Sequence, residues 1–289
     1  MERLTNNVLA IEVKEHGAEL SSIRKGETEY LWQADPAYWK RHSPVLFPIV
    51  GSVWEGRFRV CGQEYSMGQH GFARDMDFTL VSRTEDQVRF RHESSEDTLS
   101  RYPFPFSLEI AYRLHDNKVD VIWEVVNAGE TDMPFQIGAH PAFYYPDYDT
   151  NSKERGSFSF DRSDDISYIL IGGKGCADTD TRYDLQMQDG HMYIDTSSFD
   201  KDAFIIDGSQ IKKVTLHRMD GTPWLSLTFD APLVGLWSPP GKNAPFVCIE
   251  PWYGRCDRVG FEGEFKDRDC VNILAPGEKF STKYTIVIE

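Results

Sequence analysis

The sequence predicts an all-β protein, built as a large antiparallel β-sandwich with few short helices. Apolar residues recur at every second position in many segments, which is the period of a half-buried strand. Short clusters of turn-forming residues separate these segments. Aromatic residues make up 13% of the chain, and aromatic and β-branched side chains pack well on a pleated surface.

Alternating segments follow one another in pairs along the chain. The predicted strand pairs are residues 78–83 with 88–92, 106–114 with 119–125, and 214–217 with 224–229. The chain closes on another alternating segment, residues 280–288. In the clearest strand the apolar side chains that share one face are Phe106, Leu108, Ile110, Tyr112 and Leu114. Short turns between the members of each pair predict antiparallel hairpins.

Helical patterning is scarce. Residues 95–102, which stop before a proline, predict a short helix, and residues 36–40 predict one further turn because proline suits a first helical position. Residues 145–150 and 171–180 are rich in Gly, Asp and Pro and predict loops. No long linker or shift in composition divides the chain, so we expect a single domain over residues 1–289.

The charge balance excludes several classes of partner. Lys and Arg total 31 against 46 Asp and Glu, which gives a formal net charge of -15. Such a surface repels phosphate backbones and anionic lipids, so we expect no nucleic-acid or membrane partner. No N-terminal signal segment and no apolar run of about 18 residues is present. We therefore expect a cytoplasmic protein, either a monomer or a homodimer.

The five cysteines are scattered and form no CxxC pair. Cys248 and Cys256 lie eight residues apart, without the neighbouring His or Cys residues that a zinc site shows in sequence. The sequence therefore predicts reduced, structural thiols and no bound metal.

Two apolar segments are each interrupted by a titratable residue that a proline follows at once. Residues 135–143 contain His140-Pro141, and residues 246–254 contain Glu250-Pro251. Proline has no N–H for a ladder, so we expect each strand to end, bulge or lie at an edge there. His140 and Glu250 are thus predicted to project from strand ends into a mouth lined by the aromatic residues Phe143, Tyr144, Trp252 and Tyr253.

This pair of residue types suits proton transfer near neutral pH, because His titrates at about 6.5 and burial raises the pKa of Glu. Flat aromatic side chains beside them suit the apolar face of a sugar ring. The alternative is a structural role, in which Glu250 forms a buried ion pair with Arg255 or Arg258.

Two further segments hold candidate ligand contacts. His70 and Arg74 lie four apart around a glycine, which predicts a loop that aims two donors at a ligand oxygen. The alternative is a tight turn in which Arg74 pairs with Asp75 or Asp77. Trp237 precedes a Pro-Pro-Gly turn and is either a stacking platform for a ligand or simply the end of a strand.

Taken in order, these segments resemble the aldose 1-epimerase family, and specifically its LacX-like branch. The matching stretches are Leu46-Phe47-Pro48-Ile49-Val50-Gly51, His70-Gly71-Phe72-Ala73-Arg74, Ala139-His140-Pro141-Ala142-Phe143, Gly235-Leu236-Trp237-Ser238 and Cys248-Ile249-Glu250-Pro251-Trp252.

The resemblance implies an isomerase that interconverts the α and β anomers of a free hexose without a cofactor or a metal. Glu250 matches the general base that removes the anomeric hydroxyl proton, and His140 matches the general acid that protonates the ring oxygen. His70 matches a second family histidine that hydrogen-bonds the sugar. The further expected sugar contacts are Arg74, Trp237 and Trp252.

The match has two gaps. Many relatives have an Arg where this chain has Ser52, so either Arg57 or Arg74 takes that role or the substrate is held differently. The family also uses an Asp upstream of the Glu, and both Asp202 and Asp207 are near the expected place.

The alternatives are a hexose-6-phosphate 1-epimerase, which would need a basic cluster for the phosphate, and a sugar-binding protein or sensor without turnover. Glycoside hydrolysis would need two carboxylates, and the sequence offers one in a convincing site.

Overall fold

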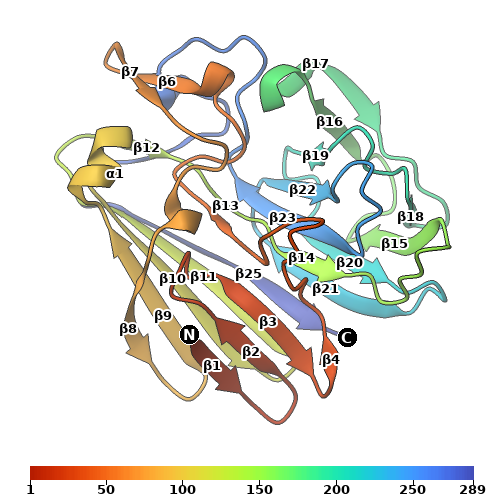
Figure 1. The fold of residues 1–289 in the computed structure, drawn as a ribbon. Helices are drawn as coiled ribbons and strands as arrows, with labels where there is room; N and C mark the ends of the chain where they lie inside the picture. The colour runs from red at the N-terminus through yellow and green to blue at the C-terminus, as the bar shows by residue number, and fades with distance from the viewer.

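Antiparallel strands make up nearly all of the regular structure in the computed structural model, which describes residues 1–289. They form a nine-stranded sheet, an eight-stranded sheet, a four-stranded sheet and two two-stranded pairs (Figure 1). The prediction of a large antiparallel β-sandwich with few short helices is confirmed.

The nine-stranded sheet runs across the lower part of the view in Figure 1. Its strands, in spatial order, are β18 (His191–Asp195), β15 (Glu154–Phe160), β20 (Lys213–His217), β21 (Pro223–Phe229), β25 (Lys279–Ile288), β11 (Lys118–Asn127), β10 (Phe106–His115), β9 (Gln87–Glu93) and β8 (Thr79–Arg83). The three predicted hairpins are confirmed as β8–β9, β10–β11 and β20–β21. The alternating C-terminal segment is confirmed as β25.

The hairpin of β10 and β11 shows how the alternation translates into packing. Its antiparallel register pairs Phe106 with Asn127 and His115 with Lys118. Every second side chain, including Leu108 on β10, enters a core cluster of 61 buried residues. Burial of such side chains contributes about 1.5–3 kcal/mol each, so the period-two pattern is the main determinant of this sheet.

The eight-stranded sheet carries the candidate site. Its strands, in spatial order, are β17 (Ala177–Asp184), β16 (Ser167–Ile171), β19 (Phe204–Ile206), β22 (Leu233–Trp237), β23 (Phe246–Tyr253), β13 (Ile137–Ala139) and β5 (Val45–Leu46), and β14 (Ala142–Tyr144) also pairs with β23. In Figure 1 this sheet lies above β15, β20 and β21. Val247 and Ile249 of β23 belong to the same core cluster as Leu225 and Leu227 of β21, so the two sheets share one core.

The remaining strands cover the other part of the nine-stranded sheet or extend its rim. The four-stranded sheet consists of β1 (Glu2–Thr5), β2 (Ala10–Val13), β3 (Leu20–Lys25) and β4 (Thr28–Glu29). It lies over β8–β11 in Figure 1, and β1 contacts β9. The two-stranded pairs are β6 (Arg57–Val60) with β7 (Gln63–Ser66), and β12 (Met133–Phe135) with β24 (Asn272–Leu274).

The one α-helix, α1 (Glu96–Arg101), confirms the helix predicted at residues 95–102. Ser95 caps it: the Thr98 N–H donates to the Ser95 hydroxyl, and the Ser95 N–H donates to the Thr98 hydroxyl at 2.8 Å. Four short 3-10 turns complete the helical structure, namely η1 (Trp54–Gly56), η2 (Ala73–Asp75), η3 (Gly173–Gly175) and η4 (Phe265–Asp267). None of these helices has the length and apolar character that crossing a bilayer would require.

The single turn predicted near residues 36–40 is confirmed: the Tyr38 and Trp39 N–H groups both donate to the Asp35 carbonyl, at 3.1 and 3.0 Å. One local prediction was wrong. Residues 171–180 are not one loop, because β17 begins at Ala177. Most side chains of β17 are exposed at the edge of the sheet, so this strand has no apolar alternation that could reveal it.

Candidate active site

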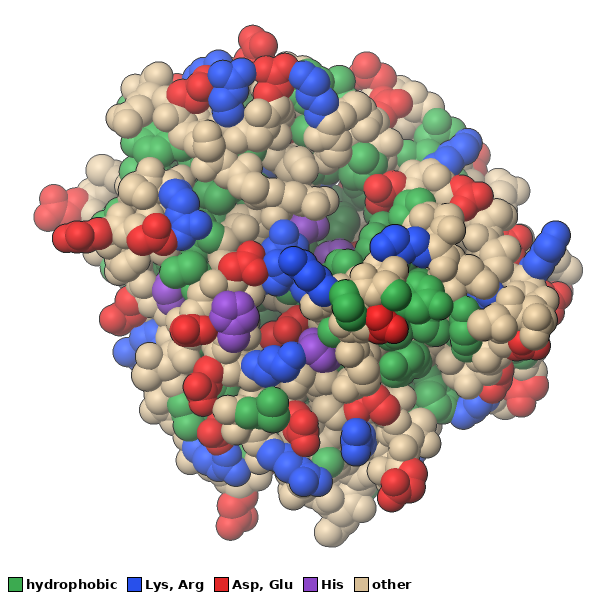
Figure 2. All heavy atoms as spheres, viewed as in Figure 1, with side chains coloured by type: hydrophobic (Ala, Val, Ile, Leu, Met, Phe, Trp, Pro, Cys, Tyr) green, Lys and Arg blue, Asp and Glu red, His purple; other side chains and the backbone are tan.

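A cavity of about 290 Å³ opens above the middle of the eight-stranded sheet. Figure 2 shows a hollow near the centre of the molecule, with histidine side chains inside it and Lys or Arg side chains at its rim. The six residues predicted for the site all line this cavity: His70, Arg74, His140, Trp237, Glu250 and Trp252. Side chains from distant parts of the chain therefore meet in one cavity.

An interruption of the sheet creates the position of the central pair. β13 stops at Ala139 and β14 begins at Ala142, and both strands pair with the same edge of β23. His140 lies in the gap between them, opposite Glu250. The prediction that β23 would end or bulge at Glu250 was wrong, because β23 continues through Pro251 to Tyr253. β23 tolerates the missing N–H of Pro251 because the neighbouring strand is interrupted there, between β13 and β14.

His140 and Glu250 face each other, and both side chains are almost fully buried. The His140 Nε2 atom lies 3.3 Å from the Glu250 Oε2 atom, and the two side chains are 9% and 2% exposed. Arg255 and Arg258 do not contact Glu250; both instead pair with Asp269, at 2.6 and 2.8 Å. The structural alternative for Glu250 is therefore wrong, since no cation neutralises its carboxylate.

Burial pushes both members of the pair toward their neutral forms. Desolvation, reinforced by the negative charge of Asp202, holds the pKa of Glu250 well above its usual range. Desolvation, reinforced by the positive charge of Arg74, holds the pKa of His140 well below its usual range. A carboxylate with a raised pKa is a stronger base, and an imidazolium with a lowered pKa is a stronger acid.

His70 presents a hydrogen-bond donor whose position is fixed by the backbone. The Gly51 N–H donates to the His70 Nδ1 atom at 3.0 Å, so Nδ1 is an acceptor. Desolvation, followed by the charge of His140, lowers the pKa of His70 well below 6.5 and keeps the ring neutral. The one ring proton must then reside on Nε2. The ring lies 5.5 Å from that of His140, with the two planes nearly perpendicular.

Three tryptophans form the aromatic surfaces of the cavity. Trp39 stacks on the His140 ring at 4.7 Å, and Trp237 meets the same ring edge-on at 5.3 Å. Trp252 lies at the floor, where its indole N–H donates to the Ala139 carbonyl at 3.2 Å. Trp237 is the last residue of β22, as one of its two interpretations predicted, and it also lines the cavity. Its role as a stacking platform for a ligand stays a prediction.

The predicted mouth of four aromatic residues was wrong for three of them. Phe143 is fully buried in the core, and Tyr144 packs edge-on against Trp32. Tyr253 packs against Phe280. Successive side chains of a strand point to opposite faces, so Tyr253 cannot share the cavity with Trp252.

Two glycines make room for the Trp252 indole. A Cβ atom at Gly138 would lie 2.6 Å from Trp252 Cδ1, and one at Gly235 would lie 2.6 Å from Trp252 Cζ2 and Cη2. Gly138 of β13 pairs with Trp252, and Gly235 of β22 pairs with Glu250 on the other side of β23. The indole ring therefore spreads across three strands. The floor of the cavity thus depends on the absence of side chains at both positions.

We expect Gly235→Ala to displace Trp252 and to lower the free energy of unfolding by about 1–3 kcal/mol, the usual cost of overpacking a core. Urea unfolding and tryptophan fluorescence measure both effects. Gly68→Ala is the matched control, because a Cβ atom at Gly68 would meet nothing within 4 Å. Equal stability of the two variants would contradict this account of the cavity floor.

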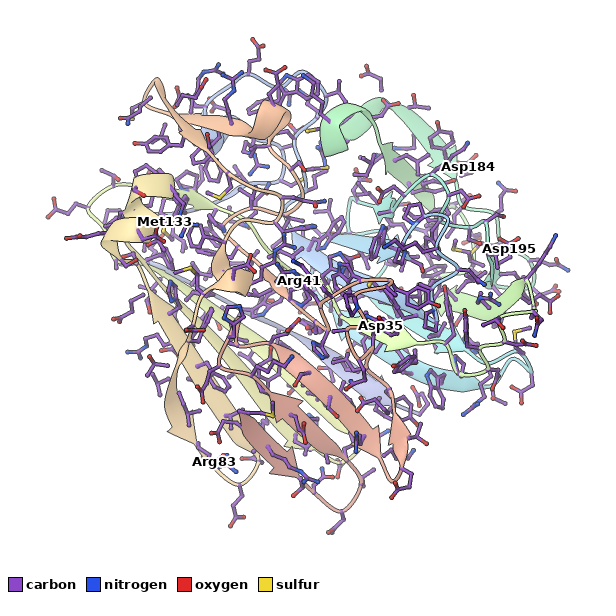
Figure 3. The ribbon with its side chains drawn as sticks, viewed as in Figure 1. Asp35, Arg41, Arg83, Met133, Asp184 and Asp195 are labelled. Atoms are coloured by element: carbon purple, nitrogen blue, oxygen red, sulfur yellow. The ribbon has the colours of Figure 1, made fainter.

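Arg74 brings positive charge to the cavity. Its Nη2 donates to the Gln69 carbonyl at 2.8 Å, but its Nε atom is buried without a hydrogen-bond partner. Asp75 is 3.8 Å from this Nε and instead contacts Arg41 at 2.8 Å. Figure 3 places Arg41 near the centre of the same face of the molecule. Desolvation, followed by the charge of Arg41, lowers the pKa of Arg74 to about 10, so Arg74 stays protonated at neutral pH.

The structure separates the alternatives that the sequence left open. Arg57 lies at the surface, paired with Glu55 and Glu64, whereas Arg74 lines the cavity. Asp207 pairs with Arg182 at 2.8 Å, away from the cavity.

Asp202 lines the cavity, and its charge acts on Glu250. Its backbone has a positive φ of 69°, and its carboxylate accepts the Ala203 N–H at 2.8 Å. Of the two aspartates, Asp202 is the one in reach of a bound ligand.

The sequence analysis missed several residues of the cavity wall. Trp39 is the most important of them, since it stacks on His140. The sequence signal that could have indicated it is the pair of aromatic residues Tyr38-Trp39 in a turn that begins with a proline. Gln69 and Cys256 also line the cavity. They follow from tertiary packing, and no local pattern marks them.

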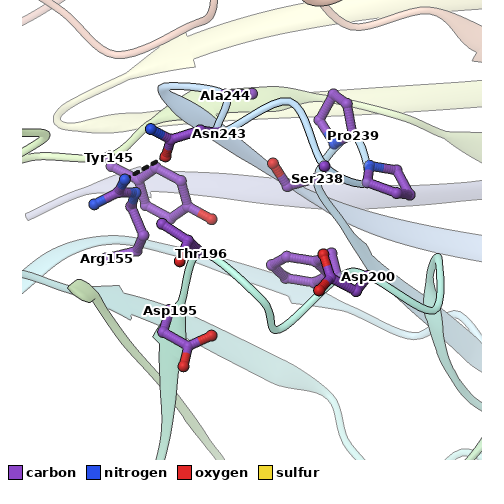
Figure 4. Close-up of a pocket in the computed structure, with 12 residues that line it drawn as sticks. Tyr145, Arg155, Asp195, Thr196, Asp200, Ser238, Pro239, Asn243 and Ala244 are labelled. Atoms are coloured by element: carbon purple, nitrogen blue, oxygen red, sulfur yellow. Dashed lines mark hydrogen bonds between the residues drawn. The ribbon is translucent and has the colours of Figure 1, made fainter. Parts of the chain in front are cut away.

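A second hollow in the structure is too small for a sugar (Figure 4). Its volume is about 20 Å³, and it is lined by Tyr145, Arg155 and Asn243, among others. Arg155 donates to the Asn243 side chain across it.

The chain is similar to known proteins over its full length. The family profile described as Aldose 1-epimerase matches residues 3–287. The chromosomal protein LacX of Lactococcus lactis is 32% identical over 99% of this chain and 98% of its own length. The structure of a galactose mutarotase related enzyme from Lactobacillus acidophilus has a TM-score of 0.93 and 32% identity, and covers 100% of this chain and 97% of its own. A galactose mutarotase-like protein from Lactobacillus casei has a TM-score of 0.94 and 27% identity, with both chains fully covered.

Proposed function

The chain belongs to the aldose 1-epimerase family, and from this premise we propose that it interconverts the α and β anomers of a free hexose. The observation that carries the proposal is the pair of His140 Nε2 and Glu250 Oε2, 3.3 Å apart in a buried cavity. Family membership supports an aldose epimerase in general. The choice of a free hexose is our own inference.

The geometry of the pair suits the atoms that must react. The anomeric hydroxyl and the ring oxygen of a cyclic sugar share one carbon, so a base and an acid that serve them must be close neighbours. Glu250 as carboxylate takes the proton of the anomeric hydroxyl, and His140 as imidazolium gives a proton to the ring oxygen as the bond from carbon to ring oxygen breaks. The open-chain aldehyde rotates and recloses on its other face with the proton transfers reversed. One proton on the pair is sufficient for each turnover.

The surrounding residues supply the remaining roles. His70 lines the cavity 5.5 Å from the His140 ring, and its Nε2–H can donate to a sugar oxygen. The Asp202 carboxylate accepts hydrogen bonds from sugar hydroxyls, and Arg74 donates to them. Trp237 and Trp252 offer apolar surfaces to the carbon face of the ring.

Polarimetry on freshly dissolved α-glucose and α-galactose tests the proposal directly. Wild-type protein is expected to speed the approach to the anomeric equilibrium above the spontaneous rate. Saturation-transfer NMR then reports the exchange at equilibrium. If the protein binds aldoses without speeding exchange with any of them, the epimerase proposal is wrong and a sugar-binding role replaces it.

A second candidate, epimerisation of a hexose 6-phosphate, is favoured by one observation. Arg41 lies close enough to the cavity residue Arg74 for its charge to lower the Arg74 pKa, so two positive side chains lie near this cavity in a chain whose net charge is -15. If the phosphate is bound there, kcat/KM for glucose 6-phosphate exceeds that for glucose, and Arg41→Gln lowers the former alone. Equal effects of Arg41→Gln on kcat/KM for both sugars would show that Arg41 supports the structure of the site and does not bind the phosphate.

A further inference from the structure

The fold brings a thiol to the acid–base pair that no sequence spacing reveals. The ligand atoms of His140, Cys248 and Glu250 all lie within 4.8 Å of one another, and all three residues are buried. Cys248 and Glu250 are two residues apart on β23, so their side chains share one face of the sheet. We propose that these three side chains bind a divalent cation of the zinc type, which competes with the sugar.

The donor set is the kind that zinc takes. One imidazole, one thiolate and one carboxylate offer N, S and O ligands, and three protein ligands leave a fourth tetrahedral position for water or another small ligand. A thiolate selects a borderline or soft cation over Mg²⁺ or Ca²⁺, which prefer oxygen ligands throughout.

The distances are close to those a tetrahedral site needs. Bonds of about 2.0–2.3 Å to zinc place neighbouring ligand atoms about 3.3–3.6 Å apart. The His140 Nε2 and Glu250 Oε2 atoms are already 3.3 Å apart. The remaining separations are at most 4.8 Å. A movement of about 1 Å, within reach of a rotation of the Cys248 side chain, completes the geometry.

One unsatisfied polar atom points to a missing ligand at this place. The Glu250 Oε2 atom is buried without a hydrogen-bond partner. Unpaired buried polar atoms are uncommon, and a bound cation would satisfy the carboxylate oxygen directly. His140 and Glu250 line the cavity, so a cation can enter through it.

Such a cation would inhibit the proposed reaction. Coordination would occupy the lone pairs of His140 and Glu250 that proton transfer requires, so zinc and sugar would exclude each other. Binding of the cation is independent of the proposed function, whereas inhibition rests on it. The two parts are therefore measured separately.

The binding test uses full-length protein with Cys61→Ser and Cys270→Ser, since both of these thiols are exposed. Titration with Co²⁺ is expected to give a thiolate charge-transfer absorption at one equivalent per chain, and calorimetry with Zn²⁺ the same stoichiometry. Cys248→Ala is expected to remove the absorption and to weaken Zn²⁺ binding by at least about 100-fold, because even residues that only support a ligand contribute about 10- to 100-fold.

Cys256→Ala is the matched control, because Cys256 is also a buried cysteine at this cavity but lies outside the group of three. It is expected to keep both the absorption and the affinity. Absence of the Co²⁺ band, or equal Zn²⁺ affinity in Cys248→Ala and the parent protein, would overturn the metal site.

Inhibition is then measured as the anomer-exchange rate with and without Zn²⁺, and after addition of EDTA. We expect Zn²⁺ to suppress exchange reversibly, with an apparent affinity that weakens as sugar is added. In Cys248→Ala the same Zn²⁺ concentration should leave that variant's own metal-free rate unchanged. Tight binding with undiminished exchange would refute competition, and binding by a protein that shows no exchange would count against the proposed function alone.

Discussion

Replacing Glu250 with glutamine is expected to lower the catalysed rate of anomer exchange by about 10²- to 10⁴-fold, the range that a general acid or base contributes. Glutamine keeps the shape of the side chain but cannot accept the anomeric proton. Because the amide still fills the cavity wall, sugar binding should change little, and the loss should fall on kcat rather than on KM. Saturation-transfer NMR at several sugar concentrations separates the two constants.

His140→Asn should cause a loss of similar size, and the double variant should be little worse than either single one. This non-additivity follows because the two groups act in one proton relay, so removal of either partner disables both. An unchanged rate in Glu250→Gln, or fully additive losses, would contradict the assignment of the pair.

Glu250→Gln, which is expected to lower activity, is expected to raise stability. Burial raises the pKa of Glu250 in the folded protein, so the folded state holds its proton more tightly than the unfolded state does. The free energy of unfolding therefore falls as pH rises from the unfolded pKa of about 4.3 toward the folded pKa. Glu250→Gln removes this loss, and we expect it to unfold at a higher temperature than wild type at neutral pH. A calorimetric comparison at pH 5 and pH 8 checks both the sign and the slope, and it also excludes misfolding as the cause of lost activity.

The sequence predicted seven of the nine strands of the nine-stranded sheet, because most of them bury one face and expose the other. In β10, Phe106, Leu108 and Ile110 enter the core, whereas Ser107 and Glu109 do not. The alternation of apolar and polar residues therefore indicates the strand. β17 lacks such a contrast, and its existence depends on neighbours far along the chain. The Ala177 N–H donates to the Asp257 carbonyl, a contact that no local pattern encodes.

The candidate site was predictable for a different reason. In both His140-Pro141 and Glu250-Pro251, a titratable residue followed by proline interrupts an apolar strand pattern. Such interruptions are found at functional sites, where function competes with regular structure. The aromatic partners were harder to predict because their direction depends on which face of a strand each residue occupies. Trp252 faces the cavity and Tyr253 the core, although the two are adjacent in sequence.

The proximity of Cys248 to His140 depends on the pairing of β14 with β23. It could not be inferred from the 107 residues of chain between them, since register between distant strands is a tertiary property.

The largest effect on stability is expected at a buried ion pair behind the cavity. The Arg268 Nε donates to the Asp257 Oδ1 at 2.5 Å, and the two side chains are 1% and 2% exposed. The Asp257 Oδ2 also accepts the Trp54 N–H at 2.8 Å, and the Asp257 N–H donates to the Ser52 carbonyl at 2.9 Å. Asp257 therefore ties the segment around Gly51, whose N–H positions His70, to the segment that carries Arg268.

We expect Asp257→Asn to lower the free energy of unfolding by about 3–5 kcal/mol, because it leaves the Arg268 charge buried without a counter-charge. The matched control is Arg258→Ala, which breaks the half-exposed ion pair with Asp269 and should change stability by about 1 kcal/mol or less. Urea unfolding measures both values. Because replacement of a buried pair by apolar residues is often tolerated, Asp257→Leu combined with Arg268→Leu should recover part of the loss. If the double variant is no more stable than Asp257→Asn, loss of the acceptor for the Trp54 N–H costs as much as the uncompensated charge of Arg268.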